Sequence, residues 1–273
     1  MHHLAGLQGY QAPGALFVRE LIANGDIGQL LAVSVVAAGG PAGRRIPQAN
    51  VYATDVAAGA TVLSISTGHL LATLAREVGE FRELSAVVAL INTETTVIET
   101  GQTVPVTAPD QVVLAGRLED GAVASIAVQG GSAAVTPGFE VRIVGTEATL
   151  VVRPATPGGI HITDWAISIA KPDGSAADLP VPGRFSPVPE AVPPGPPRNV
   201  AAAYREFARA ISYGEPPRRT SPPPSGTTSC LSGSSGRRTP VSARTPTARL
   251  GGHERSWRPA HRRMRRSSPA PPG

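Results

Sequence analysis

The sequence predicts an α+β domain built on a large, mainly antiparallel, open-faced sheet with helices packed on one face. Two amphipathic segments with helical spacing come first, near residues 13–24 and 63–78. From Leu84 onward the apolar pattern alternates as in strands, and short turns such as Glu119 to Gly121 join one strand to the next. Strands joined by short turns pair antiparallel, so we expect the preceding helices to cover one face and leave the other open.

Residues 216–273 differ in composition from the rest of the chain. They contain 12 Arg, 11 Pro and 10 Ser with a single acid, Glu254, so this segment carries a net charge of +11. Because the whole chain carries +5, residues 1–215 carry −6. These residue types build no core. We therefore expect an ordered domain over 1–215 and a disordered Arg/Pro/Ser-rich tail over 216–273.

The arginine-rich tail has two interpretations. Lys171 is the only lysine beside 24 arginines, which indicates a GC-rich gene, and an out-of-frame segment of such a gene would have this composition. The alternative is a natural flexible arm that binds RNA or an acidic surface. Because the basic charge belongs to the tail and not to a folded face, a nucleic-acid partner is not favoured.

Cysteine usage and hydropathy favour a cytoplasmic protein without a membrane span. The only cysteine, Cys230, lies in the tail, so residues 1–215 offer no disulfide framework and no thiolate metal site. No other spacing indicates a metal-ligand cluster. The longest apolar run, around Leu30 to Ala38, is too short to span a membrane, and the N-terminus lacks the pattern of a signal peptide.

The first forty residues predict a strand, a helix and a second strand. HLAGLQGY, residues 3–10, has the pattern of a short strand. Pro13 suits the first turn of a helix that Gly25 ends. The apolar face of this helix carries Phe17, Val18, Leu21 and Ile22. LLAVSVVAA, residues 30–38, predicts a largely buried strand, and a loop follows to about residue 50.

A second helix contains the histidine that bears on function. Its apolar stripe consists of Leu63, Leu70, Leu71, Leu74 and Val78, and Gly79 ends it. Ser66 or Thr67 is a plausible N-cap. Either cap would place His69 in the first turn, at the solvent-accessible start of the helix.

The remaining segments predict strands and a closing helix. QVVLAGRL with AVASIAV, and FEVRIVG with TLVVR, form two hairpins, and IHITDWAISIA, residues 160–170, is a further strand. Residues 198–211 predict a helix, with Asn199 available as its cap, that docks through an apolar stripe. That stripe consists of Val200, Tyr204, Phe207, Ala208 and Ile211.

Five stretches resemble the C-terminal half of the glucose-fructose oxidoreductase, inositol dehydrogenase and MocA family. These are VRELIANGDIGQLLAV, GHLLATLAREVGE, GTEATLVV, AAAYREFARAI and TAPDQVVLAGRLEDGAVAS. The last is similar to the branch that includes the galactose-regulon repressor. The resemblance implies a substrate-binding and oligomerisation domain that works beside a separate NAD(P)-binding domain. It also implies homodimer contacts through the open sheet face and a sugar or polyol ligand.

The chain departs from the family's dehydrogenases in two ways. It has no Gly-x-Gly-x-x-Gly between a strand and a helix, and Lys171 lies in a predicted turn. We therefore expect no cofactor for this chain, although the family uses NAD(P). The resemblance also implies an aspartate four residues before the histidine, where this chain has Ile65, with Ser64 before it. This variant is typical of the repressor-like branch.

Three residues are candidates for the site. The resemblance makes His69 the counterpart of the family's catalytic histidine, a general base for a sugar hydroxyl; the alternative is a polar residue at a helix start. Asp110 and Gln111 open a strand in the repressor-like stretch and are candidate substrate-binding residues. An acid at a strand start is also common turn chemistry.

Three functions remain open at this point. The first is the substrate and oligomerisation domain of an NAD(P)-dependent sugar or polyol oxidoreductase, truncated and inactive alone. The second is a non-catalytic, ligand-sensing regulator, which the missing carboxylate favours. The third is a nucleic-acid-associated protein that acts through its tail.

Overall fold

The computed structural model of the protein describes residues 6–40, 42–131 and 138–213. The predicted tail, residues 216–273, and the domain boundary proposed before it lie outside the described residues. The described part confirms the α+β fold with a mainly antiparallel sheet.

The main sheet has eight strands in the order β11-β10-β9-β8-β1-β7-β6-β3. Their bounds are β1 Leu30–Gly39, β3 Phe81–Ala89, β6 Gln111–Leu118, β7 Val123–Gly130, β8 Phe139–Gly145, β9 Thr149–Pro154, β10 Trp165–Ala170 and β11 Ala176–Asp178. Strand β1 pairs parallel with β7 and antiparallel with β8. All other neighbours in this sheet are antiparallel, and β6–β7 and β8–β9 are the two predicted hairpins.

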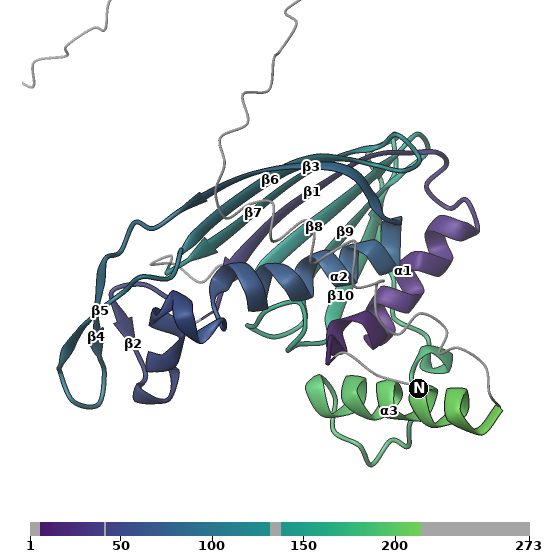
Figure 1. The fold of residues 1–273 in the computed structure, drawn as a ribbon. Helices are drawn as coiled ribbons and strands as arrows, with labels where there is room; N and C mark the ends of the chain where they lie inside the picture. The colour runs from purple at the N-terminus through teal and green to yellow at the C-terminus, as the bar shows by residue number, and fades with distance from the viewer. Residues whose placement is uncertain (1–5, 41, 132–137, 214–273) are drawn as a thin grey trace, which may run out of the picture. The chain divides into compact units, whose positions relative to one another are not determined.

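Helices α1 (Pro13–Ala23) and α2 (Thr67–Val78) lie against one face of the sheet, and no helix of the described residues covers the other face (Figure 1). Strand β1 shows why the two faces differ. Val33 and Val35 are 2% and 3% exposed and join the core, whereas Val36, which lies between Val35 and the buried Ala37, is 54% exposed. Alternate side chains of a strand point to opposite faces, so β1 separates the helix-covered core from the open face.

The start of α1 follows the prediction. Pro13 is its first residue, Gly25 beyond its end has a positive φ of 83°, and Phe17 and Val18 are buried in the core. The segment before α1 differs from the prediction. Residues Gln8–Gln11 form a 3-10 helix, η1, and not a strand. Pro13 fixes a helix start at this point, and η1 packs against α2 and the closing helix, so it has no partner strand.

Helix α2 begins at Thr67, where a cap at Ser66 would place it, but the helical stretch starts earlier. A π-helical turn, η4 (Val62–Ser66), precedes it, and Thr61 caps this turn in a reciprocal arrangement with Ser64. Ser66 stands at the predicted N-cap position of α2, but it has helical dihedrals and its side chain makes no capping hydrogen bond, and Thr67 is the first residue of α2. His69 consequently lies more than one turn from the true start, and it is 8% exposed.

A smaller sheet that the sequence did not predict is formed by short strands that follow β1 and β3 in the chain. It contains β2 (Arg45–Ile46), β4 (Glu94–Val97) and β5 (Thr103–Pro105) in the order β2-β4-β5. The short helices η2 (Gln48–Thr54) and η3 (Val56–Ala58) lie between β2 and η4 in the chain. Strands this short carry too little alternating pattern to be recognised in a sequence.

The helical stretch Val56–Val78 is long and apolar enough to cross a membrane by length and composition alone. Most residues of α2 within it are buried in the domain, including Leu70, Leu71 and Leu74. Core helices of globular domains meet the same criterion, and burial against the sheet accounts for this composition.

The closing helix α3 (Pro196–Tyr213) docks against η1, but not through the predicted stripe. Its buried residues are Asn199, Ala202 and Ala210. Tyr204 and Ile211 of the predicted stripe are 63% and 52% exposed. Asn199 is the fourth residue of the helix, so it is not the cap. Small side chains on the docked face let α3 approach η1 closely, and the larger apolar side chains remain outside.

Candidate functional site

A pocket of about 340 Å³ lies where the ends of β1 and β7 meet η4 and the loop before β10. We call it the histidine pocket. Its described lining residues are Ala37, Ala38, Gly40, Tyr52, Ala53, Ala60, Thr61, Val62, Ile65, Ser66, Leu70, Val128, Gly138, Gly158, Gly159, Ile160, His161 and Ile162. No Asp, Glu, Lys or Arg is among these described residues. The pocket is thus mostly aliphatic, with a few neutral polar groups.

Two imidazoles are stacked beside this pocket. The rings of His69 on α2 and His161 in the loop before β10 have centroids 4.1 Å apart and planes 7° apart. His161 lines the pocket, whereas His69 is not among its described lining residues and lies behind His161. In both rings Nδ1 is buried and has no hydrogen-bond partner among the described residues.

Burial keeps both imidazoles neutral near pH 7. It lowers the pKa of His69 below 6.5. Burial, together with the neighbouring His69, lowers the pKa of His161 to about 4. A proton on either ring would place a charge against the other ring in a site with little water. The pair is therefore a neutral hydrogen-bonding site and a weak proton acceptor.

The loop before β10 fixes the position of His161. Ile160 is 4% exposed, and its carbonyl accepts a hydrogen bond from Nε1 of Trp165 at 3.1 Å. The next turn closes through the Ile162 amide, which donates to the Gly159 carbonyl at 2.9 Å. Anchored on both sides, this loop turns His161 onto the ring of His69. The prediction of a strand from residue 160 is wrong, because β10 begins only at Trp165.

Glycine at position 9 lets η1 close over the histidine pair. A Cβ at Gly9 would lie 2.7 Å from Oγ1 of Thr73 and 3.4 Å from Cβ of His161. Thr73 lies one turn after His69 and donates its hydroxyl to the His69 carbonyl at 2.8 Å. A larger residue at position 9 would push η1 away from both histidines.

The position that the resemblance assigns to an aspartate is part of the pocket wall. Ile65 lines the histidine pocket and is 46% exposed. Ser64 before it cannot replace the carboxylate, because its hydroxyl is used at the helix start. It accepts from the Thr61 amide at 2.8 Å and donates to the Gly59 carbonyl. The wall thus offers no acid where a dehydrogenase of this family would have one.

Asp110 and Gln111 hold the chain's own backbone. Asp110 is 2% exposed, and its carboxylate accepts from the amides of Ile91 and Asn92 and from Nδ2 of Asn92, all within 2.9 Å. Nε2 of Gln111 donates to the Gly130 carbonyl at 2.8 Å. Asp110 borders a separate cavity of about 10 Å³, so the structure does not bring it into the histidine pocket. A substrate-binding role for these two residues stays a prediction.

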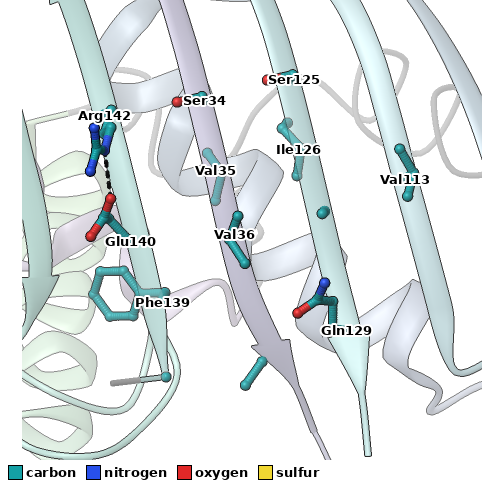
Figure 2. A pocket seen from close by; sticks show the side chains of 13 residues that line it. Ser34, Val35, Val36, Val113, Ser125, Ile126, Gln129, Phe139, Glu140 and Arg142 are labelled. Carbon is teal, nitrogen blue, oxygen red and sulfur yellow. Dashed lines mark hydrogen bonds and ion pairs between the residues drawn. The ribbon is translucent and has the colours of Figure 1, made fainter. Parts of the chain in front are cut away.

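The open face of the sheet carries a wider, shallower hollow of about 600 Å³ (Figure 2). Small and β-branched side chains such as Ser34, Val36 and Val113 form its floor. At one side Glu140 pairs with Arg142 at 2.6 Å and, through its second oxygen, with an arginine of β9. These arginines lower the pKa of Glu140, so the face carries both signs of charge.

A sequence model for the C-terminal domain of Gal80p matches residues 13–154. The chain belongs to the Gal80p C-terminal domain family. The match contains His69 but ends before His161. A curated relative is the galactose/lactose metabolism regulatory protein GAL80 of Kluyveromyces lactis, 30% identical over 157 residues. These residues are 54% of this chain and 34% of that protein, so the chain spans about a third of its length.

Solved structures share the fold of this Gal80p-like domain. A super-repressor mutant of Gal80p from Saccharomyces cerevisiae has a TM-score of 0.66 at 20% identity, over 78% of this chain and 54% of that one. Levoglucosan dehydrogenase in complex with NADH has a TM-score of 0.65 at 17% identity, over 85% of this chain and 60% of that one. The fold is thus shared by Gal80 regulators and by oxidoreductases.

The described residues do not fit a dinucleotide. Such a cofactor needs a glycine-rich turn from a strand into the N-terminus of a helix, where backbone amides meet the pyrophosphate. The glycine at the start of α1, Gly14, serves packing instead, because a Cβ there would lie 2.6 Å from Cε3 of Trp165. The start of α2 continues directly from η4. Neither of these two helix starts is therefore a glycine-rich turn of that kind.

Sequence reasoning missed His161. Apolar and polar residues alternate within the segment Gly158 to Trp165, which is the pattern of a strand. Within such a strand nothing marks His161 as a site residue. The two adjacent glycines, Gly158 and Gly159, were the available signal that this segment bends. No spacing in the sequence relates residue 161 to residue 69.

Proposed function

We propose that this domain binds a small sugar or polyol in the histidine pocket and acts as a ligand-responsive regulatory module rather than as a catalyst. The observation that supports this is the pocket wall itself. It combines a neutral imidazole and hydroxyl groups with aliphatic side chains, and Ile65 occupies the place of the carboxylate. Such a site can recognise hydroxyl groups, but it lacks a strong proton acceptor for their oxidation.

The relatives supply the ligand class. One is named for galactose and lactose metabolism, and a solved neighbour is a levoglucosan dehydrogenase in complex with NADH and levoglucosan. A second candidate function is the substrate domain of an NAD(P)-dependent sugar oxidoreductase. The fold shared with that dehydrogenase and the position of His69 within the matched region favour it.

Thermal unfolding with ligands tests this proposal. The purified chain is heated alone and with galactose, lactose, levoglucosan, L-sorbose or myo-inositol, and hits are measured by calorimetric titration. A ligand at 100 times its Kd would stabilise the folded state by about 2.7 kcal/mol. If none of these compounds stabilises the chain, the ligand pocket is refuted.

A kinetic assay separates the two candidate functions. The same sugars are incubated with the chain and NAD+ or NADP+, and reduced nicotinamide is followed by absorbance. We expect no reduction above the buffer rate. Reduction with any of these sugars that His69→Ala abolishes would replace the regulatory function with the oxidoreductase function.

We also propose that a second copy of the chain covers the open face. This face has a largely apolar floor flanked by the Glu140–Arg142 ion pair, so its apolar side chains would be buried by a twofold-related copy. Val113 is 51% exposed on this floor. Val113→Arg should shift the chain from dimer to monomer in sedimentation equilibrium. Tyr204→Ser on α3 serves as the control and should leave the dimer intact.

A further inference from the structure

The two stacked histidines differ in their access to the pocket. His69 is 8% exposed and has the ring of His161 against it at 4.1 Å. His161 contributes to the pocket wall, and His69 is absent from the described lining. A ligand in this pocket therefore meets His161 before it can reach His69. The residue that the family resemblance selects is the inner member of the pair.

The structure holds the outer ring in a fixed orientation. One face of His161 lies on His69, and its Cβ lies close to Gly9 of η1. The stack on His69 and the close approach of η1 therefore hold the ring on that side. Because Nδ1 of His161 is buried, this ring meets a ligand hydroxyl through Nε2, which a neutral imidazole can present as a donor or as an acceptor.

Besides His161, the described lining of the histidine pocket has three polar side chains, Tyr52, Thr61 and Ser66. The Ser66 hydroxyl already accepts from the Gly40 amide at 3.0 Å, and the Thr61 hydroxyl accepts from the Ser64 amide at 3.2 Å. Tyr52 is 58% exposed at the rim. Each ligand hydroxyl buried against aliphatic wall without a partner weakens binding by roughly ten-fold or more. The pocket therefore favours a ring with fewer hydroxyl groups than a free hexose.

We propose that His161 is the residue that hydrogen-bonds the ligand, that His69 positions it by stacking from behind, and that the ligand is a hydroxyl-poor ring such as an anhydrosugar. This inference rests on the proposed ligand pocket and names its binding group and ligand class. It removes the ligand-contacting role from His69.

Matched substitutions test the two histidines separately. His161→Phe keeps an aromatic ring against His69 but removes both nitrogens, and we expect levoglucosan affinity to fall about ten-fold or more. His69→Phe keeps the stack, so it should leave the affinity within about three-fold. His69→Ala removes the stack and should weaken binding, and recovery of affinity in His69→Phe shows that the ring positions its neighbour. Wild-type affinity in His161→Phe with loss of binding in His69→Phe would overturn the assignment.

Spectroscopy and a second ligand complete the test. In long-range nitrogen–proton spectra, levoglucosan should shift the ring nitrogens of His161. Unshifted His161 nitrogens in a saturated complex would also overturn it, while leaving the proposed pocket in place. Glucose, which carries two more hydroxyls than levoglucosan, should bind at least ten-fold more weakly. Equal or tighter binding of glucose would refute the ligand class, and no stabilisation by any sugar would refute pocket and inference together.

Discussion

Glu77 near the end of α2 is a buried acid whose effect on the free energy of unfolding can be measured. It is 4% exposed, and neither carboxylate oxygen has a hydrogen-bond partner among the described residues. Burial raises the pKa of Glu77 well above its ordinary value of 4.5. The folded state therefore holds a proton that the unfolded state releases above pH 4.5. The contribution of Glu77 to stability is therefore highest below pH 4.5 and falls as the pH rises toward the raised pKa.

We predict that Glu77→Gln removes this dependence. Between pH 4.5 and the raised pKa the wild type loses about 1.4 kcal/mol of unfolding free energy per pH unit, because one extra proton is bound in the folded state. The variant does not titrate, so its advantage grows with pH over the same window. Glu77→Met should gain roughly 1–3 kcal/mol more at every pH, since it also removes two unpaired buried oxygens.

Urea unfolding followed by circular dichroism from pH 4.5 to 8 measures these differences. Glu119→Gln, the same change at an exposed position in the β6–β7 turn, is the control and should parallel the wild type. If the curves of the wild type and Glu77→Gln run parallel across this range, the acid is not protonated in the folded state and the reasoning is refuted.

Three further predictions concern packing and the histidine pair. Ala210→Leu, at a fully buried position of α3, should lower the free energy of unfolding by about 1–3 kcal/mol through overpacking. Tyr204→Ser should change it by about 0.5 kcal/mol or less. If thermal melts show that Tyr204→Ser is the more destabilising of the two, the apolar stripe is the docked face. Gly14→Ala should destabilise by about 1–3 kcal/mol in urea titrations, because its Cβ would overlap Trp165, and a neutral result would contradict that packing. Because the pKa of His161 is lowered to about 4, its contribution to stability should fall as the pH drops from 6.5 toward 4. His161→Phe should reduce this pH dependence of the unfolding free energy. If the pH dependence is the same in the variant, His161 is not its source.

The parts of the fold that the sequence predicted are those specified by neighbouring residues. Pro13 and Gly25 fix both ends of α1 through backbone preferences that act locally. The Asp-Gly turn at residues 120–121 joins β6 to β7 as the alternating pattern requires. In both cases the signal and the structure lie within a few residues of each other.

The parts that were missed depend on contacts between distant segments. His161 matters because the fold places it on His69, and this pairing has no trace in the spacing of either residue. The docked face of α3 follows from the space beside η1, which admits Ala202 and Ala210 better than Tyr204. Hydrophobic periodicity indicates that a helix has an apolar face, but it does not say which face another element will cover.

The central place of β1 has a consequence for how the chain must assemble. This strand is made early, yet its neighbours on both sides, β7 and β8, extend to residue 145. The β6–β7 and β8–β9 hairpins can close from local sequence, whereas β1 must wait for both and then insert between them, and such long-range pairing is slow. Until residue 130 has left the ribosome this valine-rich strand has both edges unpaired, and the edge that pairs with β8 stays open until residue 145, which exposes the nascent polypeptide to aggregation.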